Sequence, residues 1–128
     1  MEAIIAYLEE FNAVTVILRI FLAALAGGMV GLEREFRSRP AGIRTHVMVS
    51  LGAALTTMIG VYVSLHLGID SDPLRIGAQV ISGIGFLGAC TIIATSRSQI
   101  KGLTTAAGLW TSAGVGLALG IGFYEGAI

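Results

Sequence analysis

Four long stretches of apolar residues constrain this chain most strongly. They span about residues 13–32, 45–67, 73–94 and 103–123, and each holds roughly the 20 mostly apolar residues that an α-helix needs to cross a bilayer. The connections between them are short and carry most of the charge. The sequence therefore predicts an all-α membrane protein, a four-transmembrane-helix bundle that forms one domain over residues 1–128.

The composition supports this class of protein. Charged residues make up 12% and hydrophobic residues 55% of the 128 positions, whereas an average soluble chain contains about 25% charged residues. The single cysteine, Cys90, excludes an internal disulfide and a cysteine-based metal cluster. We expect the lipid bilayer as the environment, and no metal, no cofactor and no nucleic-acid partner.

The positive charges indicate how the chain is oriented. Lysine and arginine in short connections stay on the cytoplasmic side of a membrane. Six of the eight basic residues lie in the first and third connections: Arg34, Arg37, Arg39, Arg44, Arg97 and Lys101. The N-terminal tail instead holds Glu2, Glu9 and Glu10. We therefore expect loops 33–44 and 95–102 to be cytoplasmic and both termini of this chain to be periplasmic or extracellular.

The two basic connections also resemble each other. The segments "RSRPAGIRT" and "RSQIKGLTT" share Arg, Ser, Gly and Thr at an offset of 60 residues. Each half of the chain holds two predicted spans, so a duplication would give two parallel two-helix repeats. Chance matches among frequent small residues explain the pattern equally well, and both interpretations stay open.

Small residues recur at every fourth position in the spans. In lipid the hydrophobic effect does not drive helices together. Small residues instead let helix backbones approach closely, and van der Waals packing stabilises their association. The predicted helix-packing seam consists of Gly27, Gly31, Gly52, Gly60, Gly83, Gly85, Gly88, Gly108, Ser112, Gly116 and Gly120. Parts of this seam that the bundle leaves unused would serve a homodimer.

The stretch "GIGFLG" (83–88) matches the spacing of a dinucleotide-binding fingerprint. That fingerprint requires a preceding strand and an acidic residue about 20 positions later. Here the motif lies inside a hydrophobic span and is followed by no acidic residue before Glu125. Helix packing or a helix kink explains these glycines better.

Arg19 is the one charged residue deep inside a predicted span. An ionisable residue within the membrane suggests a functional site. Its long side chain can instead extend to the outer interface. A third interpretation pairs it with backbone carbonyls or with the hydroxyl groups of Thr15, Ser82 or Thr111.

Charged residues close the first span at its inner end. Arg34 suits the negative end of the helix dipole, whereas Glu33 and Glu35 do not. The two glutamates therefore need partners, and we expect Arg44 or His46 at the start of the second span to supply them.

Threonines begin two helices at the same face, where free N–H groups and basic side chains favour an anion. The whole predicted polar functional site consists of Arg19, Glu33, Arg34, Arg44, Thr45, His46, Thr104 and Thr105. No Ser-His-Asp arrangement and no pair of catalytic carboxylates can be assembled within the spans. We therefore expect no catalytic residue and no enzyme.

Four ordered motifs carry a resemblance to a known family. "GLERE" (31–35), "RPAGIRTH" (39–46), "GIGFLGACTI" (83–92) and "GLTTAAGLW" (102–110) resemble the MgtC/SapB family of bacterial inner-membrane proteins, over about residues 15–124. Family members are associated with magnesium limitation and, in pathogens, with survival inside macrophages. Cys90 stands where the family usually has glycine, and many members continue into a fifth span and a cytoplasmic C-terminal domain.

The resemblance implies a non-enzymatic protein of the bacterial inner membrane that acts in adaptation to low magnesium. It also implies modulation of other membrane machinery, such as the ATP synthase, through a membrane-protein partner. The alternative is a small transporter or channel for Mg²⁺ or another ion. Magnesium prefers carboxylate and water oxygens, and no carboxylate lies inside a predicted span, which favours the first interpretation.

Overall fold

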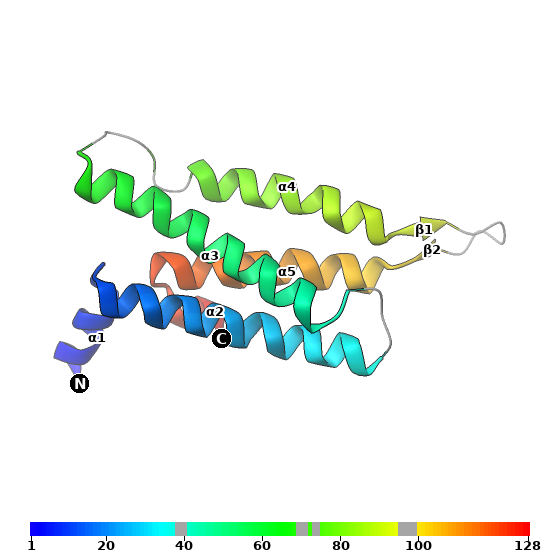
Figure 1. Ribbon diagram of the computed structural model, residues 1–128, viewed down its shortest axis with the longest axis horizontal. Helices are drawn as coiled ribbons and strands as arrows, with labels where there is room; N and C mark the ends of the chain where they lie inside the picture. The colour runs from blue at the N-terminus through cyan, green and yellow to red at the C-terminus, as the bar shows by residue number, and fades with distance from the viewer. Residues whose placement is uncertain (38–40, 69–71, 73–74, 95–99) are drawn as a thin grey trace.

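The computed structural model describes residues 1–37, 41–68, 72, 75–94 and 100–128. These residues form the helices α1 (Glu2–Glu9), α2 (Ala13–Phe36), α3 (Ile43–His66), α4 (Arg75–Thr91), α5 (Leu103–Ile121) and α6 (Tyr124–Ala127), and the strands β1 (Ile93–Ala94) and β2 (Ile100–Lys101). The four long helices α2 to α5 run alongside one another (Figure 1). The all-helical class is thereby confirmed.

Three of the described helices, α2, α3 and α5, are long and apolar enough to cross a membrane. Their mean hydropathy and lengths of 24, 24 and 19 residues match a bilayer-spanning helix. The fourth predicted span corresponds to α4, which has 17 residues. Its role as a fourth span stays a prediction.

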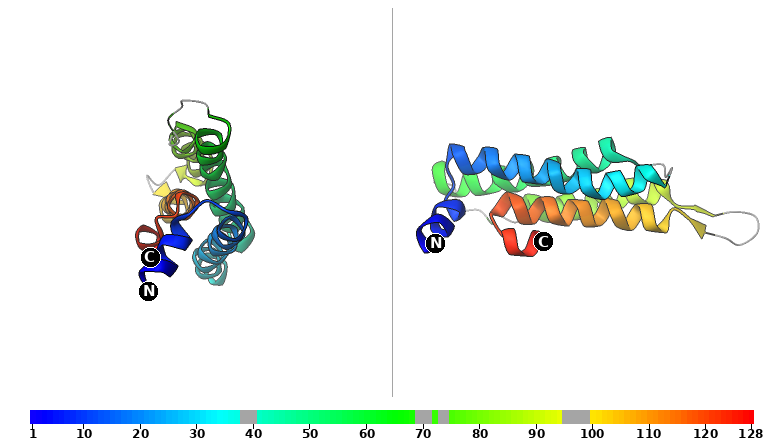
Figure 2. Two further views of the ribbon diagram at one scale, coloured as in Figure 1. Left: turned by 90° about the vertical axis from the view of Figure 1, so that its left-hand side faces the viewer. Right: turned by 90° about the horizontal axis from the view of Figure 1, so that it is seen from below.

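The two ends of the bundle differ as the charge pattern predicts. Figure 1 and Figure 2 show the C-terminal end of α2 and the N-terminal end of α3 at the same end of the bundle as β1 and β2, and α1 at the opposite end. The C-terminal α6 lies near α1, because the Tyr124 hydroxyl donates a 2.8 Å hydrogen bond to the Leu8 carbonyl.

Local sequence explains where the helices begin. Asn12 and Thr15 form a capping box at the start of α2, with reciprocal side-chain to backbone hydrogen bonds of 3.0 Å. The glycines shared by the two similar segments, Gly42 and Gly102, are the N-cap residues of α3 and α5. The duplication itself stays a prediction.

The third connection differs from expectation. α4 ends at Thr91, three residues before the predicted boundary at Ala94, and an antiparallel pair of two-residue strands follows. Gly102 explains this end: it has a φ of +91°, and a Cβ there would collide with the Thr91 carbonyl oxygen. Only glycine adopts such a backbone conformation in so little space, so the chain turns sharply where a longer helix was expected.

Small residues mediate the contacts between the long helices. A Cβ on Gly27 or Gly31 of α2 would collide with the backbone of α3, and one on Gly116 or Gly120 of α5 would do the same. Gly88 of α4 lies against Ala106 of α5. These helices therefore pack at backbone distance.

Three predicted seam positions lie elsewhere. At Gly52, Gly83 and Gly85 an added Cβ would meet no atom within 4 Å, so these glycines mediate no close helix contact within the described part of the chain. Gly60, in contrast, is buried in α3. Gly52 of α3 and Gly83 of α4 line the groove between these two helices, and all three glycines are exposed.

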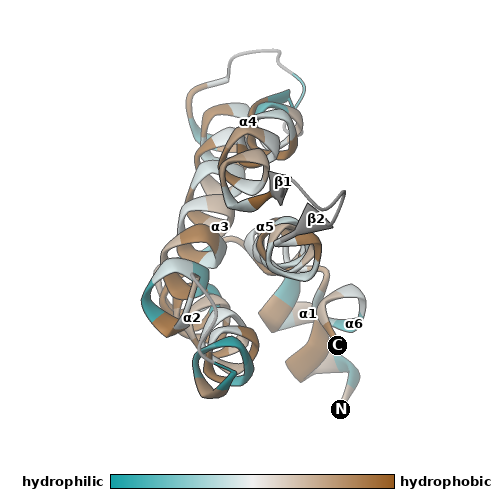
Figure 3. Ribbon diagram, turned by 90° about the vertical axis from the view of Figure 1, so that its right-hand side faces the viewer, coloured by the Kyte–Doolittle hydropathy of each residue, from teal (hydrophilic) through white to brown (hydrophobic). Residues whose placement is uncertain are grey.

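Large apolar side chains lie mainly on the outside. Ile17, Met48 and Phe86 are 69%, 67% and 73% exposed. Several of the buried hydrophobic residues are instead alanines. In Figure 3 the helix bodies are largely apolar, and hydrophilic colour gathers at the end of α2 nearest the viewer. A surface of this kind suits lipid rather than water.

Candidate functional site

The interior between three helices is polar. Among the described residues, the buried polar side chains all belong to α2, α3 or α5: Thr15, Arg19, Arg34, His46, Ser50, Thr57, Thr105 and Ser112. None of them lies on α4. A polar group inside a membrane protein is energetically costly unless it has a partner, so the partners of these groups define the site.

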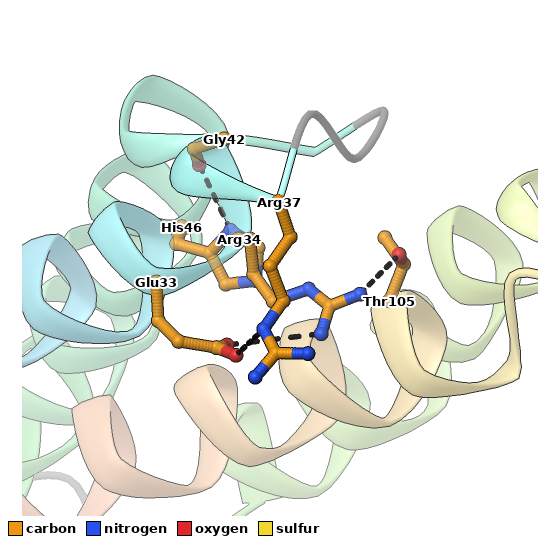
Figure 4. Close-up of polar contacts among 6 residues, drawn as sticks. All are labelled: Glu33, Arg34, Arg37, Gly42, His46 and Thr105. Carbon is orange, nitrogen blue, oxygen red and sulfur yellow. Dashed lines mark hydrogen bonds and ion pairs between the residues drawn. The ribbon is translucent and has the colours of Figure 1, made fainter.

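Arg34 is the buried cation at the end of the bundle that carries β1 and β2. Its side chain is only 6% exposed, and its Nη2 donates a 3.3 Å hydrogen bond to Thr105 Oγ1 of α5 (Figure 4). Glu33 Oε2 lies 3.7 Å from Arg34 Nη1, while Glu33 Oε1 lies 2.7 Å from Arg37 Nε. Glu33 thus shares its charge between a buried and an exposed arginine.

His46 lies beside this cluster and is fully buried. Its Nδ1 lies 2.9 Å from the Gly42 carbonyl oxygen, one turn earlier in α3 (Figure 4). A carbonyl only accepts, so Nδ1 carries the proton of this hydrogen bond. The other ring nitrogen, Nε2, faces Gly108 of α5 and has no hydrogen-bond partner among the described residues.

Two serines continue the polar interior away from Arg34. Ser50 lies one turn after His46 on α3, and Ser112 lies one turn after Gly108 on α5. Both hydroxyl oxygens are buried and, within the described part of the chain, without a hydrogen-bond partner. Our sequence analysis placed Ser112 only in the packing seam and missed Ser50. The spacing of Ser50 from His46 was the signal that it shares a helix face.

Arg19 occupies the opposite end of the interior and is 1% exposed. Its guanidinium donates to the carbonyls of Leu8, Glu9 and Glu10 at 3.1–3.4 Å, and to that of Gly120 at 3.0 Å. These carbonyls end α1 and α5, where helices leave acceptors unpaired.

The surroundings of Arg19 decide between the interpretations left open above. Its Nε donates to the Tyr124 hydroxyl at 3.3 Å, and the guanidinium carbon lies 5.8 Å from the centre of the Phe11 ring. Pairing with backbone carbonyls is therefore the arrangement observed. Extension to the interface is not, because the side chain is buried. None of the expected hydroxyl groups of Thr15, Ser82 or Thr111 accepts from it.

The other predicted site residues lie apart from this interior. Arg44, Thr45 and Thr104 are exposed. Glu35 accepts from the Ile43 backbone N–H at 3.4 Å. The expectation that Arg44 or His46 pairs with the glutamates is wrong, because Arg37 lies one helical turn after Glu33 and reaches it first.

The charge of the interior limits its chemistry. Two guanidinium groups are buried at its ends, and all seven acidic residues of the described part of the chain are exposed. In that same part no group of three or more His, Cys, Asp or Glu side chains is placed to hold a metal ion. The interior is therefore rich in hydrogen-bond donors and positively charged.

These features define a helical membrane protein in which α2, α3 and α5, the three candidate membrane spans, enclose a polar, positively charged interior. A model of the MgtC family matches residues 20–128, and the chain therefore belongs to the MgtC family. The resemblance to MgtC and SapB proteins is thereby confirmed. No solved structure matches the chain.

Curated relatives carry three names. The chain is 46% identical over 97 residues to "Putative magnesium transporter YhiD" of Escherichia coli strain K12, covering 71% of this chain and 44% of the relative. It is 40% identical over 96 residues to Protein SapB of Bacillus subtilis strain 168, covering 72% and 41%. It is 52% identical over 85 residues to Protein MgtC of Brucella abortus strain 2308, covering 66% and 34%. The chain thus spans less than half the length of these relatives.

Proposed function

We propose that this chain is the membrane bundle of a non-enzymatic protein of the bacterial inner membrane that acts in adaptation to low magnesium. It works by modulating other membrane machinery, such as the ATP synthase, and in a pathogen it supports survival inside macrophages. Membership of the MgtC family and the name of the E. coli relative support the link to magnesium.

The observation that carries this proposal is the charge of the interior. Buried Arg19 and Arg34 lie at its two ends, and no described carboxylate is buried between them. A divalent cation that leaves water needs oxygen ligands, usually with one or two carboxylates, and a buried arginine on its path repels it. A role in contact with partner proteins is therefore favoured over passage of Mg²⁺ through the bundle.

The outward faces support a partner within the membrane. Gly83 and Gly85 of α4 and Gly52 of α3 are exposed small residues that no described helix of the chain covers. Such positions allow close approach of another helix. In our proposal α4 is the fourth span, the chain forms a homodimer, and loops 33–44 and 95–102 face the cytoplasm.

The second candidate is a small transporter or channel for Mg²⁺ or another ion. The printed name of the E. coli relative and the buried hydroxyl groups of Ser50, Thr57 and Ser112 favour it. In this case Glu33, half-exposed beside Arg34, lies at the mouth of the path.

Ion flux separates the two candidates. Purified chain is reconstituted into liposomes that contain a Mg²⁺-sensitive dye, beside a Glu33→Ala variant and protein-free liposomes. In parallel, ATP-driven proton pumping is measured in inverted bacterial membrane vesicles with and without the chain. The proposal expects no Mg²⁺ flux from folded protein and a change in pumping. Flux that Glu33→Ala removes would establish the transporter instead.

A further inference from the structure

Four buried polar atoms gather along one interior face, and none has a partner within the described residues. They are Arg34 Nε of α2, His46 Nε2 and Ser50 Oγ of α3, and Ser112 Oγ of α5. The residues that carry them are at most 5% exposed. Leaving such a group without a hydrogen bond costs about 1–3 kcal/mol, so four of them together call for an occupant.

The packing contacts of α5 relate the positions of these atoms to one another. Gly108 faces His46 Nε2, and Gly116 packs against the backbone of Ser50. Ser112 lies midway between these two glycines on the same face of α5. Arg34 is held by Thr105, less than one turn before Gly108. The four atoms therefore occupy neighbouring turns of one three-helix interface.

The hydrogen-bonding character of the four atoms selects the occupant. Arg34 Nε–H only donates. His46 Nε2 accepts in the neutral ring, because Nδ1 holds the proton that bonds Gly42. The two serine hydroxyls can do both. A metal ion needs acceptors alone and an anion needs donors alone, whereas water satisfies a mixed set and commonly makes about three hydrogen bonds.

Gly108 packs closely against the ring of His46. A Cβ added there would lie 3.3 Å from His46 Nε2 and 4.0 Å from Val30 Cγ1, with no other described neighbour outside the backbone of α5 within 4 Å. A contact of 3.3 Å is tighter than most Cβ contacts, so a methyl group at this position would lie against Nε2 and block its access to water.

We propose that α2, α3 and α5 enclose a hydrated polar site in which ordered water bridges His46 Nε2, Ser50 Oγ, Ser112 Oγ and Arg34 Nε. The site lies inside the apolar bundle and holds the imidazole of His46 as a neutral acceptor. This inference stands apart from the proposed function, because it depends only on local chemistry.

Magnetic resonance of the whole chain in lipid bilayers tests the proposal. Histidine labelled with ¹³C and ¹⁵N reports both histidines, and exposed His66 of α3 is the control for a wetted ring. We expect His46 as the Nδ1–H tautomer, with transfer of magnetisation from water to its ring. In a second sample labelled at leucine, Leu109, which is 1% exposed on α5, is the dry control and should receive none.

Substitutions locate the water. Gly108→Ala should lower the transfer at His46 severalfold and leave His66 unchanged, and Ser112→Ala should lower it by removing one partner. Gly114→Ala, where a Cβ meets open space, should have no effect. A His46 ring that carries its proton on Nε2, or that stays as dry as Leu109 in the folded wild-type protein, overturns the proposal. Unchanged transfer in folded Gly108→Ala protein also overturns it.

Discussion

Arg19 donates five hydrogen bonds, four of them to backbone carbonyls and one to Tyr124. The carbonyls belong to the C-terminal ends of α1 and α5, which are negative ends of helix dipoles. Gly122 leaves the space for this side chain, since a Cβ there would lie 2.8 Å from Arg19 Nη2. The Arg19 guanidinium thus satisfies carbonyl groups at the ends of α1 and α5 and links α1 and α6 to the bundle.

Arg19→Ala should therefore destabilise the protein strongly. Each buried acceptor that loses its donor costs about 1–3 kcal/mol, and Arg19→Ala removes the donor from four carbonyls. Tyr124→Phe should cost less, about 1–3 kcal/mol in all, because it removes two hydrogen bonds, one from Arg19 and one to Leu8. Thermal and chemical unfolding of purified protein in detergent measures both. Equal effects of the two variants would contradict the dominant role assigned to Arg19.

Single residues were predicted from the sequence to different degrees. An arginine among apolar residues has few ways to be satisfied, so pairing of Arg19 with carbonyls was foreseeable. Its partner Tyr124 was not, because 105 residues separate them and only the packing of α6 brings them together. Ser50 carries no charge and fits a packing position as well as a polar one, so only its spacing from His46 marked it as part of the same helix face.

The contact between α3 and α5 depends on glycine at a defined register. Gly116→Leu should disrupt folding or assembly, because a side chain there meets Ser50 and Ala53 of α3, and overpacking costs about 1–3 kcal/mol or more. Gly114→Leu is the matched control, since that position faces open space. Unfolding midpoints and oligomer size by light scattering test the pair. A similar loss of stability in both variants would contradict a specific need for glycine at position 116.

The end of α4 offers a second test at this scale. Gly68 and Gly102 both have positive φ, of +64° and +91°, but only Gly102 lies against other atoms. Gly68→Ala should cost about 1–2 kcal/mol from backbone strain alone. Gly102→Ala should cost more, because its Cβ also meets the Thr91 carbonyl. The free energy of unfolding of both variants is measured under identical conditions. An equal loss of stability would show that the contact with Thr91 contributes nothing.

The sequence predicts the ends of some helices and not of others. Apolar length predicted the positions of α2, α3 and α5 within a few residues, because membrane spans depend on composition more than on neighbours. The end of α4 was not predictable in this way. It depends on the contact between Thr91 and Gly102, which lie on opposite sides of the third connection. Hydropathy gives no information about such a contact.

The arrangement of the whole chain predicts its labelling in cells. In a Cys90→Ala background, Glu2→Cys should react with a membrane-impermeant maleimide added to spheroplasts, and Arg37→Cys should react only after the membrane is opened. The charge pattern supports this orientation, and both side chains are exposed. The reverse labelling pattern would invert the topology, and labelling of both sites from outside would contradict it.

The central position of α3 has a mechanical consequence. α3 contacts α2, α4 and α5; one of its sides presents His46 and Ser50 to the interior, and another lines a groove with α4 that includes Met48 and Gly52. A packed helix shifts as a rigid unit. A shift of α3 at the groove would therefore move His46 and Ser50 as well, because one rigid helix carries both sides.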